Sequence, residues 1–97
     1  MVVGVARLNM HLPENHSLKG KRRVIKGMIS QVRSRFDVAI SEVGLHDLWQ
    51  SAEIGISAVG NSQPVLNSVM DKIIDFIDGF PLIEIVRADV EYIHIRE

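Results

Sequence analysis

The order in which the hydrophobic period changes along the chain is the strongest constraint on its fold. Residues 2–12 and 51–59 alternate between apolar and other side chains, which is the period of a half-buried β-strand. Residues 18–36 and 64–77 instead carry apolar side chains three or four positions apart, which is the period of an amphipathic helix. The chain therefore contains at least two predicted strands, each followed by a predicted helix.

Two further segments complete the pattern. Residues 38–43 and 82–95 follow the two predicted helices and are predicted to be strands. The apolar phase of residues 82–95 shifts along their length, which predicts a β-bulge or a change in packing. Ser17 is expected to cap the start of the first helix, and Gly79 is expected to end the second.

The resulting order, βαββαβ, predicts an α+β domain with the ferredoxin-like plait. Right-handed crossovers place both helices on one face of a four-stranded antiparallel sheet, with the first and third strands in its centre. We expect the 97 residues to form one such domain, residues 1–97, because this length is typical of a single domain. The other face of the sheet is expected to be open to solvent or to a partner.

The composition excludes several kinds of site. There is no cysteine, so disulfides, thiolate metal ligands and cysteine nucleophiles are excluded. The four histidines lack the spacing of metal ligands, and we expect neither a metal nor another cofactor. The N-terminal segment lacks the features of a signal peptide, and no apolar run approaches the roughly 20 residues that a membrane span needs. We therefore expect a cytoplasmic protein without a membrane partner.

The charged residues are distributed unevenly along the chain. Residues 1–37 contain eight basic and two acidic residues, whereas residues 38–97 contain three basic and ten acidic residues, although the net charge is only −1. Five of the basic residues lie within residues 19–26. Such a split favours either an anionic partner at the basic end or self-association of the chain.

The first predicted helix carries most of this positive charge, with no acidic residue between Glu14 and Asp37. Like charges three or four positions apart repel each other, and cations near a helix N-terminus oppose the helix dipole. An anionic partner would offset both costs, and RNA fits an extended ridge of cations better than a single phosphate does. A plain solvated helix face is the alternative. The candidate nucleic-acid-binding residues are Ser17, Lys19, Lys21, Arg22, Arg23, Lys26 and Arg33.

The connection between the second and third predicted strands contains the sequence HDLWQ, with the only tryptophan of the chain. One interpretation is that Leu48 and Trp49 close the end of the core while Gln50 satisfies backbone groups. The other is a recognition loop, in which tryptophan supplies stacking area and its polar neighbours supply hydrogen bonds. The candidate recognition residues are His46, Asp47, Trp49 and Gln50.

The open face of the predicted sheet would carry polar and charged side chains instead of the aromatic residues on which RNA-recognition domains stack bases. These side chains are Arg7, Asn9, His11, Glu53, Ser57, Arg87, Asp89 and Glu91. Such a face is either solvated or, through pairs of arginine and acidic side chains, the interface of a homodimer.

The motifs HSLKGKRRV and HDLWQ, in this order and at this spacing, resemble those of the YlxP-like family, and the resemblance covers essentially the whole chain. The matching residues are Ser17, Leu18, Lys19, Lys21, Arg22, Phe36, Val38, Ser41, Glu42, Asp47, Trp49 and Gln50. The resemblance implies a ferredoxin-like plait in a bacterial domain of unknown function. Genes of the family commonly lie among those for translation initiation and ribosome maturation, which implies a role associated with RNA or the ribosome.

Two positions depart from the pattern of that family. Its members often carry an acidic residue where Gly20 stands, which would complete a capping box with Ser17. They also often carry an arginine where Ser51 follows the tryptophan–glutamine pair. If that arginine belongs to the working surface, weaker or different binding is expected here.

These observations predict a non-enzymatic accessory protein that binds RNA or the ribosome through its first helix. The alternative is a protein–protein adaptor or homo-oligomeric module, in which the acidic second helix meets a basic helix of another copy. A hydrolase of the acylphosphatase type shares this plait, but it needs an arginine in the loop after the first strand and an asparagine on the third. Residues 12–17 contain no arginine and residues 51–59 contain no asparagine.

Overall fold

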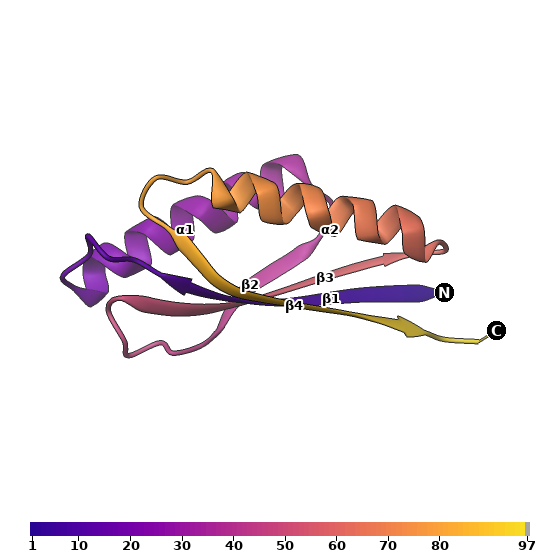
Figure 1. Ribbon diagram of the computed structural model, residues 1–97, viewed down its shortest axis with the longest axis horizontal. Coiled ribbons are helices and arrows are strands. Elements are labelled where there is room, and N and C mark those ends of the chain that lie inside the picture. The colour runs from indigo at the N-terminus through magenta and orange to yellow at the C-terminus, as the bar shows by residue number, and fades with distance from the viewer. Residues whose placement is uncertain (97) are drawn as a thin grey trace.

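The structure is a computed structural model that describes residues 1–96 of the 97-residue chain. Its helices and strands follow one another in the order βαββαβ (Figure 1). The elements are β1 (Val2–His11), α1 (Leu18–Arg35), β2 (Ala39–Gly44), β3 (Ser51–Gly60), α2 (Gln63–Asp78) and β4 (Glu84–His94). The predicted α+β class and ferredoxin-like plait are confirmed.

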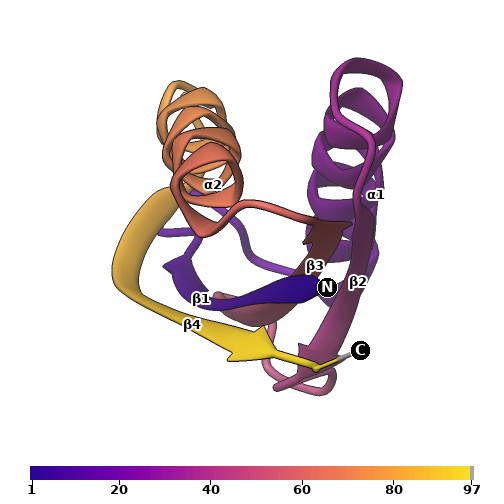
Figure 2. The ribbon, with the colours of Figure 1, turned by 90° about the vertical axis from the view of Figure 1, so that its right-hand side faces the viewer.

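The four strands form one antiparallel sheet in the order β2-β3-β1-β4, so that β1 and β3 are central. These two strands pair along their whole lengths, from Val2 opposite Gly60 to His11 opposite Ser51. Both helices cover the same face of the sheet, and the opposite face is open, as Figure 2 shows. The arrangement is the one that right-handed crossovers through the two helices produce.

The core lies between the sheet and the helices and is built from the apolar side of each element. Along β1 the buried side chains alternate with more exposed ones, as the sequence period predicts. Leu8, Ile54 and Met28, from the two central strands and α1, have no exposed surface. Burial of one such side chain contributes roughly 1.5–3 kcal/mol to the free energy of unfolding. Phe36 and Phe76 meet edge to face between the two helices.

Both helices begin at serine residues that satisfy free backbone N–H groups. The Oγ atom of Ser17 accepts a hydrogen bond from the Gly20 amide at 3.0 Å, and Ser62 caps α2 in the same way. The second helix ends at Asp78 with Gly79 as its C-cap, where the sequence places its end. Gly79 has a φ of −77°, so this helix ends without the left-handed conformation that a terminal glycine often supplies.

One β-bulge interrupts the pairing of β4 with β1. Asn9 pairs with Arg87 whereas Met10 pairs with Ile85, so Val86 is the extra residue. The side chain of Val86 is 69% exposed. The bulge reverses the faces of the side chains before and after it, which explains the shift in apolar phase and confirms the predicted irregularity.

The open face of the sheet carries the polar side chains predicted for it. Arg7 and Arg87 both approach the carboxylate of Asp89, with nitrogen–oxygen distances of 3.6 Å and 3.0 Å. These charges are therefore paired within one chain. The central strands β1 and β3 contain no phenylalanine, tyrosine or tryptophan, so this face lacks the large stacking rings of RNA-recognition domains. The homodimer interface suggested for this face stays a prediction.

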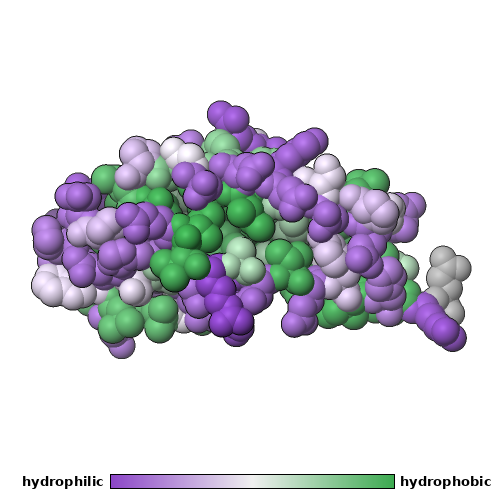
Figure 3. Space-filling model, in the orientation of Figure 1, coloured by the Kyte–Doolittle hydropathy of each residue, from purple (hydrophilic) through white to green (hydrophobic). Residues whose placement is uncertain are grey.

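The side of the molecule formed by α2 and β4 has a mixed surface. Figure 3 shows that hydrophobic side chains gather in the middle of this side, among hydrophilic ones that cover most of it. Leu82, which precedes β4, and Val86, near the start of β4, are among the exposed hydrophobic residues. Within residues 1–96, no helix is long and apolar enough to cross a membrane.

Candidate nucleic-acid interface

The predicted nucleic-acid-binding residues lie on and just before α1, and the helical period divides them between two sides. The buried residues of α1 are Lys21, Ile25, Met28 and Val32, spaced three or four positions apart. The remaining cations of the predicted site are exposed. We call these exposed side chains the basic ridge, which consists of Lys19, Arg22, Arg23, Lys26 and Arg33.

Lys21 is the exception, and its assignment to the nucleic-acid-binding residues is wrong because its side chain is buried. Its relative exposure is 0%. Its ammonium group donates hydrogen bonds to three backbone carbonyl oxygens, at 2.8 Å to Leu45, 3.1 Å to His46 and 3.1 Å to Ser51. An external phosphate has no access to an ammonium group enclosed in this way.

Glu42 of β2 compensates the buried charge of Lys21. The Nζ atom of Lys21 lies 3.1 Å from Oε2 of Glu42, and the Glu42 side chain is 17% exposed. The three N–H donors of the ammonium group serve the three carbonyls, and Oε2 has no hydrogen-bond partner in the described part of the chain. Glu42 therefore neutralises the ammonium by proximity. We call Lys21 with these four partners the lysine clamp, which ties α1 to β2 and to residues 45–51.

The four cations in the first half of the basic ridge lack a comparable partner. Lys19, Arg22, Arg23 and Lys26 are exposed, and among residues 1–96 none of them forms an ion pair with a carboxylate. Repulsion between cations three or four positions apart costs a few tenths of a kcal/mol per pair, and the helix dipole adds a further cost at this end. The fold itself offsets neither cost on this side of α1.

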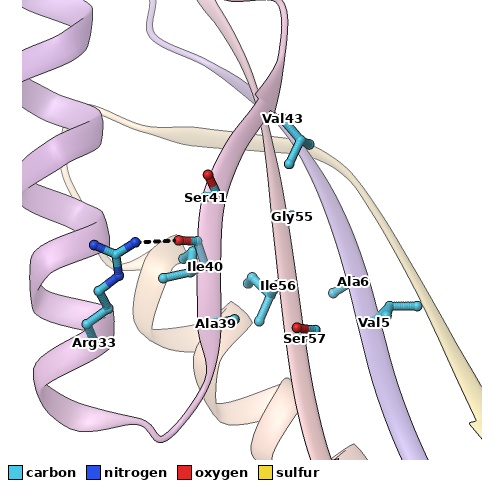
Figure 4. Close-up of a pocket in the computed structure, with 10 residues that line it drawn as sticks. All are labelled: Val5, Ala6, Arg33, Ala39, Ile40, Ser41, Val43, Gly55, Ile56 and Ser57. Carbon is cyan, nitrogen blue, oxygen red and sulfur yellow. Dashed lines mark hydrogen bonds between the residues drawn. The ribbon is translucent and has the colours of Figure 1, made fainter.

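Arg33 extends the basic ridge toward the edge strand β2. Figure 4 shows its side chain reaching from α1 toward the backbone carbonyl of Ile40, to which Nη2 donates a hydrogen bond at 2.9 Å. The bond occupies one free carbonyl of the sheet edge, where unpaired groups would otherwise attract another strand. The other donors of the exposed guanidinium remain available. Beside it lies a shallow hollow of about 420 Å³ along β2 and β3.

Leu48 and Trp49 do not close the end of the core, so that part of the first interpretation of the 45–50 loop is wrong. Trp49 is 52% exposed and Leu48 is 49% exposed. Leu45 has a φ of 59°, in the left-handed region, and its carbonyl accepts a hydrogen bond from the Leu48 amide at 3.1 Å. The loop therefore makes a tight, hydrogen-bonded turn that presents large apolar side chains to the outside.

The polar residues predicted for this loop have different surroundings. His46 and Asp47 are exposed, and Nε2 of His46 lies 3.3 Å from the carbonyl oxygen of Glu42. Gln50 is half-buried, and its amide donates hydrogen bonds to the carbonyls of Pro13 and Asn15 at 3.4 Å and 3.0 Å. Gln50 thus satisfies backbone groups, as the first interpretation of the loop predicts. Its side-chain N–H donors are used within the protein.

Asn15 is the residue of this region that the sequence analysis missed. Its side-chain amide donates to the carbonyls of both Ser17 and Trp49, and so connects the start of α1 to the 45–50 loop. The Leu12 amide donates to the Gln50 carbonyl at 2.9 Å and adds a second connection. An asparagine in a turn before a helix does not indicate a hydrogen-bond partner more than 30 residues away. The burial of Lys21, in contrast, was indicated by its position four residues before Ile25, on the apolar side of the helix.

The basic ridge and the exposed loop therefore meet at one end of the molecule. Figure 1 shows the first turn of α1 and the connection between β2 and β3 at the same end, away from both chain termini. Ser17, the residue immediately before α1, is exposed, and its hydroxyl is used in capping this helix. Within the described residues no group of three or more histidine, aspartate or glutamate side chains is placed to hold a metal ion.

These observations define a ferredoxin-like α+β domain with a cationic first helix and an exposed tryptophan loop beside it. The chain belongs to the family described as "Protein of unknown function (DUF503)", whose model matches residues 3–90. It is similar to the "Uncharacterized protein YlxP" of Bacillus subtilis (strain 168), with 37% identity over 83 residues, which are 86% of this chain and 90% of that protein. The resemblance to the YlxP-like family is confirmed.

Removing the ammonium of the lysine clamp should destabilise the domain strongly. Lys21→Met leaves a carboxylate and three carbonyls without their cation, and breaking a buried ion pair in this way costs about 3–5 kcal/mol. Lys26→Met removes an exposed cation from the same helix and should change the free energy of unfolding by less than about 0.5 kcal/mol. Urea unfolding of both variants measures the difference.

The double variant Lys21→Met/Glu42→Gln refines this test. It should recover part of the stability lost in Lys21→Met because no buried carboxylate is left without a counter-ion, although the carbonyls stay unpaired. Equal stability of Lys21→Met and Lys26→Met would show that the clamp does not support the fold.

Two glycines of α1 should respond differently to alanine. A Cβ at Gly27 meets nothing within 4 Å, so Gly27→Ala should stabilise the domain by up to about 1 kcal/mol through helix propensity. A Cβ at Gly20 would collide with Oδ1 of Asn15, so Gly20→Ala should lose this gain as Asn15 is displaced from Ser17 and Trp49. Thermal and urea unfolding compare the two variants. An equal gain in the free energy of unfolding for both would show that Asn15 is not held in its position by its hydrogen bonds.

Proposed function

We propose that this protein is a non-enzymatic accessory protein that binds structured RNA, ribosomal RNA above all, through the basic ridge of α1. The observation that carries the proposal is the contrast between Lys21 and the other cations of residues 19–26. Lys21 is neutralised inside the fold by Glu42, whereas the other four have no carboxylate partner among residues 1–96. Unpaired cations gathered on one side of a helix raise the local potential and attract a polyanion.

The length of the ridge favours RNA over a small phosphate ligand. From Lys19 to Arg33 the helix rises by about 20 Å, at 1.5 Å per residue. A single phosphate group reaches only one part of this length, whereas a nucleic-acid backbone presents a phosphate at every nucleotide. The association with ribosome maturation that the family resemblance implies supports ribosomal RNA, in the cytoplasm, as the ligand.

The proposal is one of binding without catalysis. The hydrolase alternative needs an arginine in the loop after β1 and an asparagine on β3, and the sequence supplies neither. His46 and Asp47 are neighbours in the sequence but form no ion pair in the described structure. No pair of side chains in the 45–50 loop is thus arranged as a base with the group that orients it.

The adaptor alternative rests on the acidic side of α2. Asp71, Asp75 and Asp78 are exposed, and a basic helix of a second copy would complement them. Light scattering tests this alternative directly: a dimer that Asp71→Lys/Asp75→Lys dissociates would support it, and a monomer at all concentrations would contradict it.

Reversing two charges of the basic ridge should remove most RNA binding and leave the domain folded. In Arg22→Glu/Lys26→Glu two exposed, unpaired side chains change sign, so affinity for ribosomal RNA fragments should fall by at least about tenfold at fixed salt. The dependence of log K on log salt should also become shallower, by roughly 0.7–0.9 for each lost phosphate contact. Gel-shift titrations at several salt concentrations measure both quantities.

The matched control is Lys72→Glu/Arg96→Glu, which changes the net charge equally with side chains outside the ridge. It should bind RNA nearly as the wild type does, and circular dichroism should show both variants folded. If the two double variants lose affinity equally, net charge alone governs binding and the ridge is not the RNA-binding surface. Unchanged co-sedimentation of the ridge variant with ribosomes would also contradict the proposal.

A further inference from the structure

We infer that Trp49 is the stacking surface for one unpaired nucleobase, so that the preferred RNA has a single-stranded nucleotide next to the segment held by the basic ridge. This inference rests on the proposed function and deepens it. It assigns the phosphates to α1 and a base to the 45–50 loop. The ligand is then a junction between paired and unpaired RNA.

The first observation is that Trp49 is exposed although its backbone is fixed. The side chain is 52% exposed. The Trp49 carbonyl accepts a hydrogen bond from the Asn15 amide, and the residues around it are held by the lysine clamp and by Gln50. An indole on a mobile loop could fold back onto the protein. Here hydrogen bonds hold the backbone of the loop, so a ligand that covers the ring needs to order little backbone.

The second observation is that the other aromatic residues are unavailable for stacking. Phe36, Phe76, Phe80 and Tyr92 are partly buried and pack against the core. The central strands that carry the stacking residues of RNA-recognition domains have none here. Within residues 1–96, Trp49 is therefore the one exposed side chain among phenylalanine, tyrosine and tryptophan, which provides one large ring for a single base and not a platform for a run of stacked bases.

The third observation is that the elements holding Trp49 also hold the start of the basic ridge. Asn15 donates to the carbonyls of both Ser17 and Trp49. Lys21, two residues beyond Lys19, donates to the carbonyls of Leu45 and His46. Because these contacts hold the loop against the first turn of α1, an RNA backbone lying on the ridge would continue toward the loop that carries the indole.

The polar neighbours of Trp49 suit a base and its ribose. His46 and Asp47 are exposed beside it and offer hydrogen-bond donors and acceptors to a base edge or a 2′-hydroxyl. The carboxylate of Asp47 would repel a phosphate, which favours a base or sugar over the backbone at this point. The loop and the ridge thus select different parts of the same nucleotide chain.

Because Trp49 is the only tryptophan, its fluorescence reports on this loop alone. The experiment compares two RNA hairpins with equal numbers of phosphates, one blunt-ended and one with a short single-stranded adenosine tail. For the wild type, the tailed hairpin should quench the fluorescence and bind more tightly than the blunt one. Trp49→Ala should lose about tenfold or more in affinity for the tailed hairpin and little for the blunt one.

Two controls complete the design. Trp49→Phe keeps an aromatic ring and should retain most of the preference for the tailed hairpin. Leu48→Ala removes a neighbouring side chain of similar exposure, 49% against 52%, and should leave that preference unchanged. Thermal unfolding checks that each variant is folded. Since Trp49 and Leu48 are exposed, these substitutions should change the unfolding temperature little.

The outcomes separate this inference from the proposed function. If Arg22→Glu/Lys26→Glu weakens binding of both hairpins while Trp49→Ala binds both as the wild type does, RNA binding stands and the stacking inference is overturned. Equal losses for both hairpins in Trp49→Ala would also overturn it, because the indole would not distinguish unpaired nucleotides. If the wild type binds neither hairpin nor ribosomal RNA, the proposed function itself fails.

Discussion

The buried ammonium group of Lys21 is the interaction on which the structure of the candidate site depends. A charge inside a protein is tolerated only where a counter-charge lies close and its hydrogen-bond donors are satisfied. Glu42 supplies the counter-charge, and three backbone carbonyls accept the hydrogen bonds of the ammonium group. These partners belong to β2, to the loop that follows it and to the first residue of β3. One side chain of α1 thereby fixes both the position of the helix over the sheet and the path of the loop that carries Trp49.

The same burial explains how α1 tolerates an unfavourable outer side. Cations in its first half repel each other and oppose the helix dipole, so this segment would be a weak helix in isolation. Within the domain, its inner side contributes the lysine clamp and the buried Ile25, Met28 and Val32. Tertiary contacts of this kind supply most of the stability of helices in proteins. The four cations in the first half of the ridge form no ion pair among residues 1–96, so their charge is available for a ligand.

The sequence predicted the architecture because each element has a clear hydrophobic period, and the phase shift in residues 82–95 even predicted the irregularity at Val86. It was less informative at the candidate site. Lys21 was assigned by its charge, although its spacing from Ile25 placed it on the apolar side of the helix. The exposure of Trp49 depends on Asn15 and Gln50, whose hydrogen bonds join residues 34 to 37 positions apart. Local patterns do not contain such contacts.

Of the two positions expected to depart from the family pattern, Ser51 belongs to the lysine clamp and Gly20 precedes Lys21 in the chain. Asn15 occupies the space that a side chain at position 20 would need. Its amide connects the start of α1 to the 45–50 loop through the carbonyls of Ser17 and Trp49. At Ser51 the clamp uses the backbone carbonyl, so the identity of the side chain does not affect the hydrogen bond from Lys21. An arginine there would add charge to the surface without changing the clamp. The framework of this end is thus set by the Lys21, Asn15 and Gln50 side chains, which donate hydrogen bonds to backbone carbonyls.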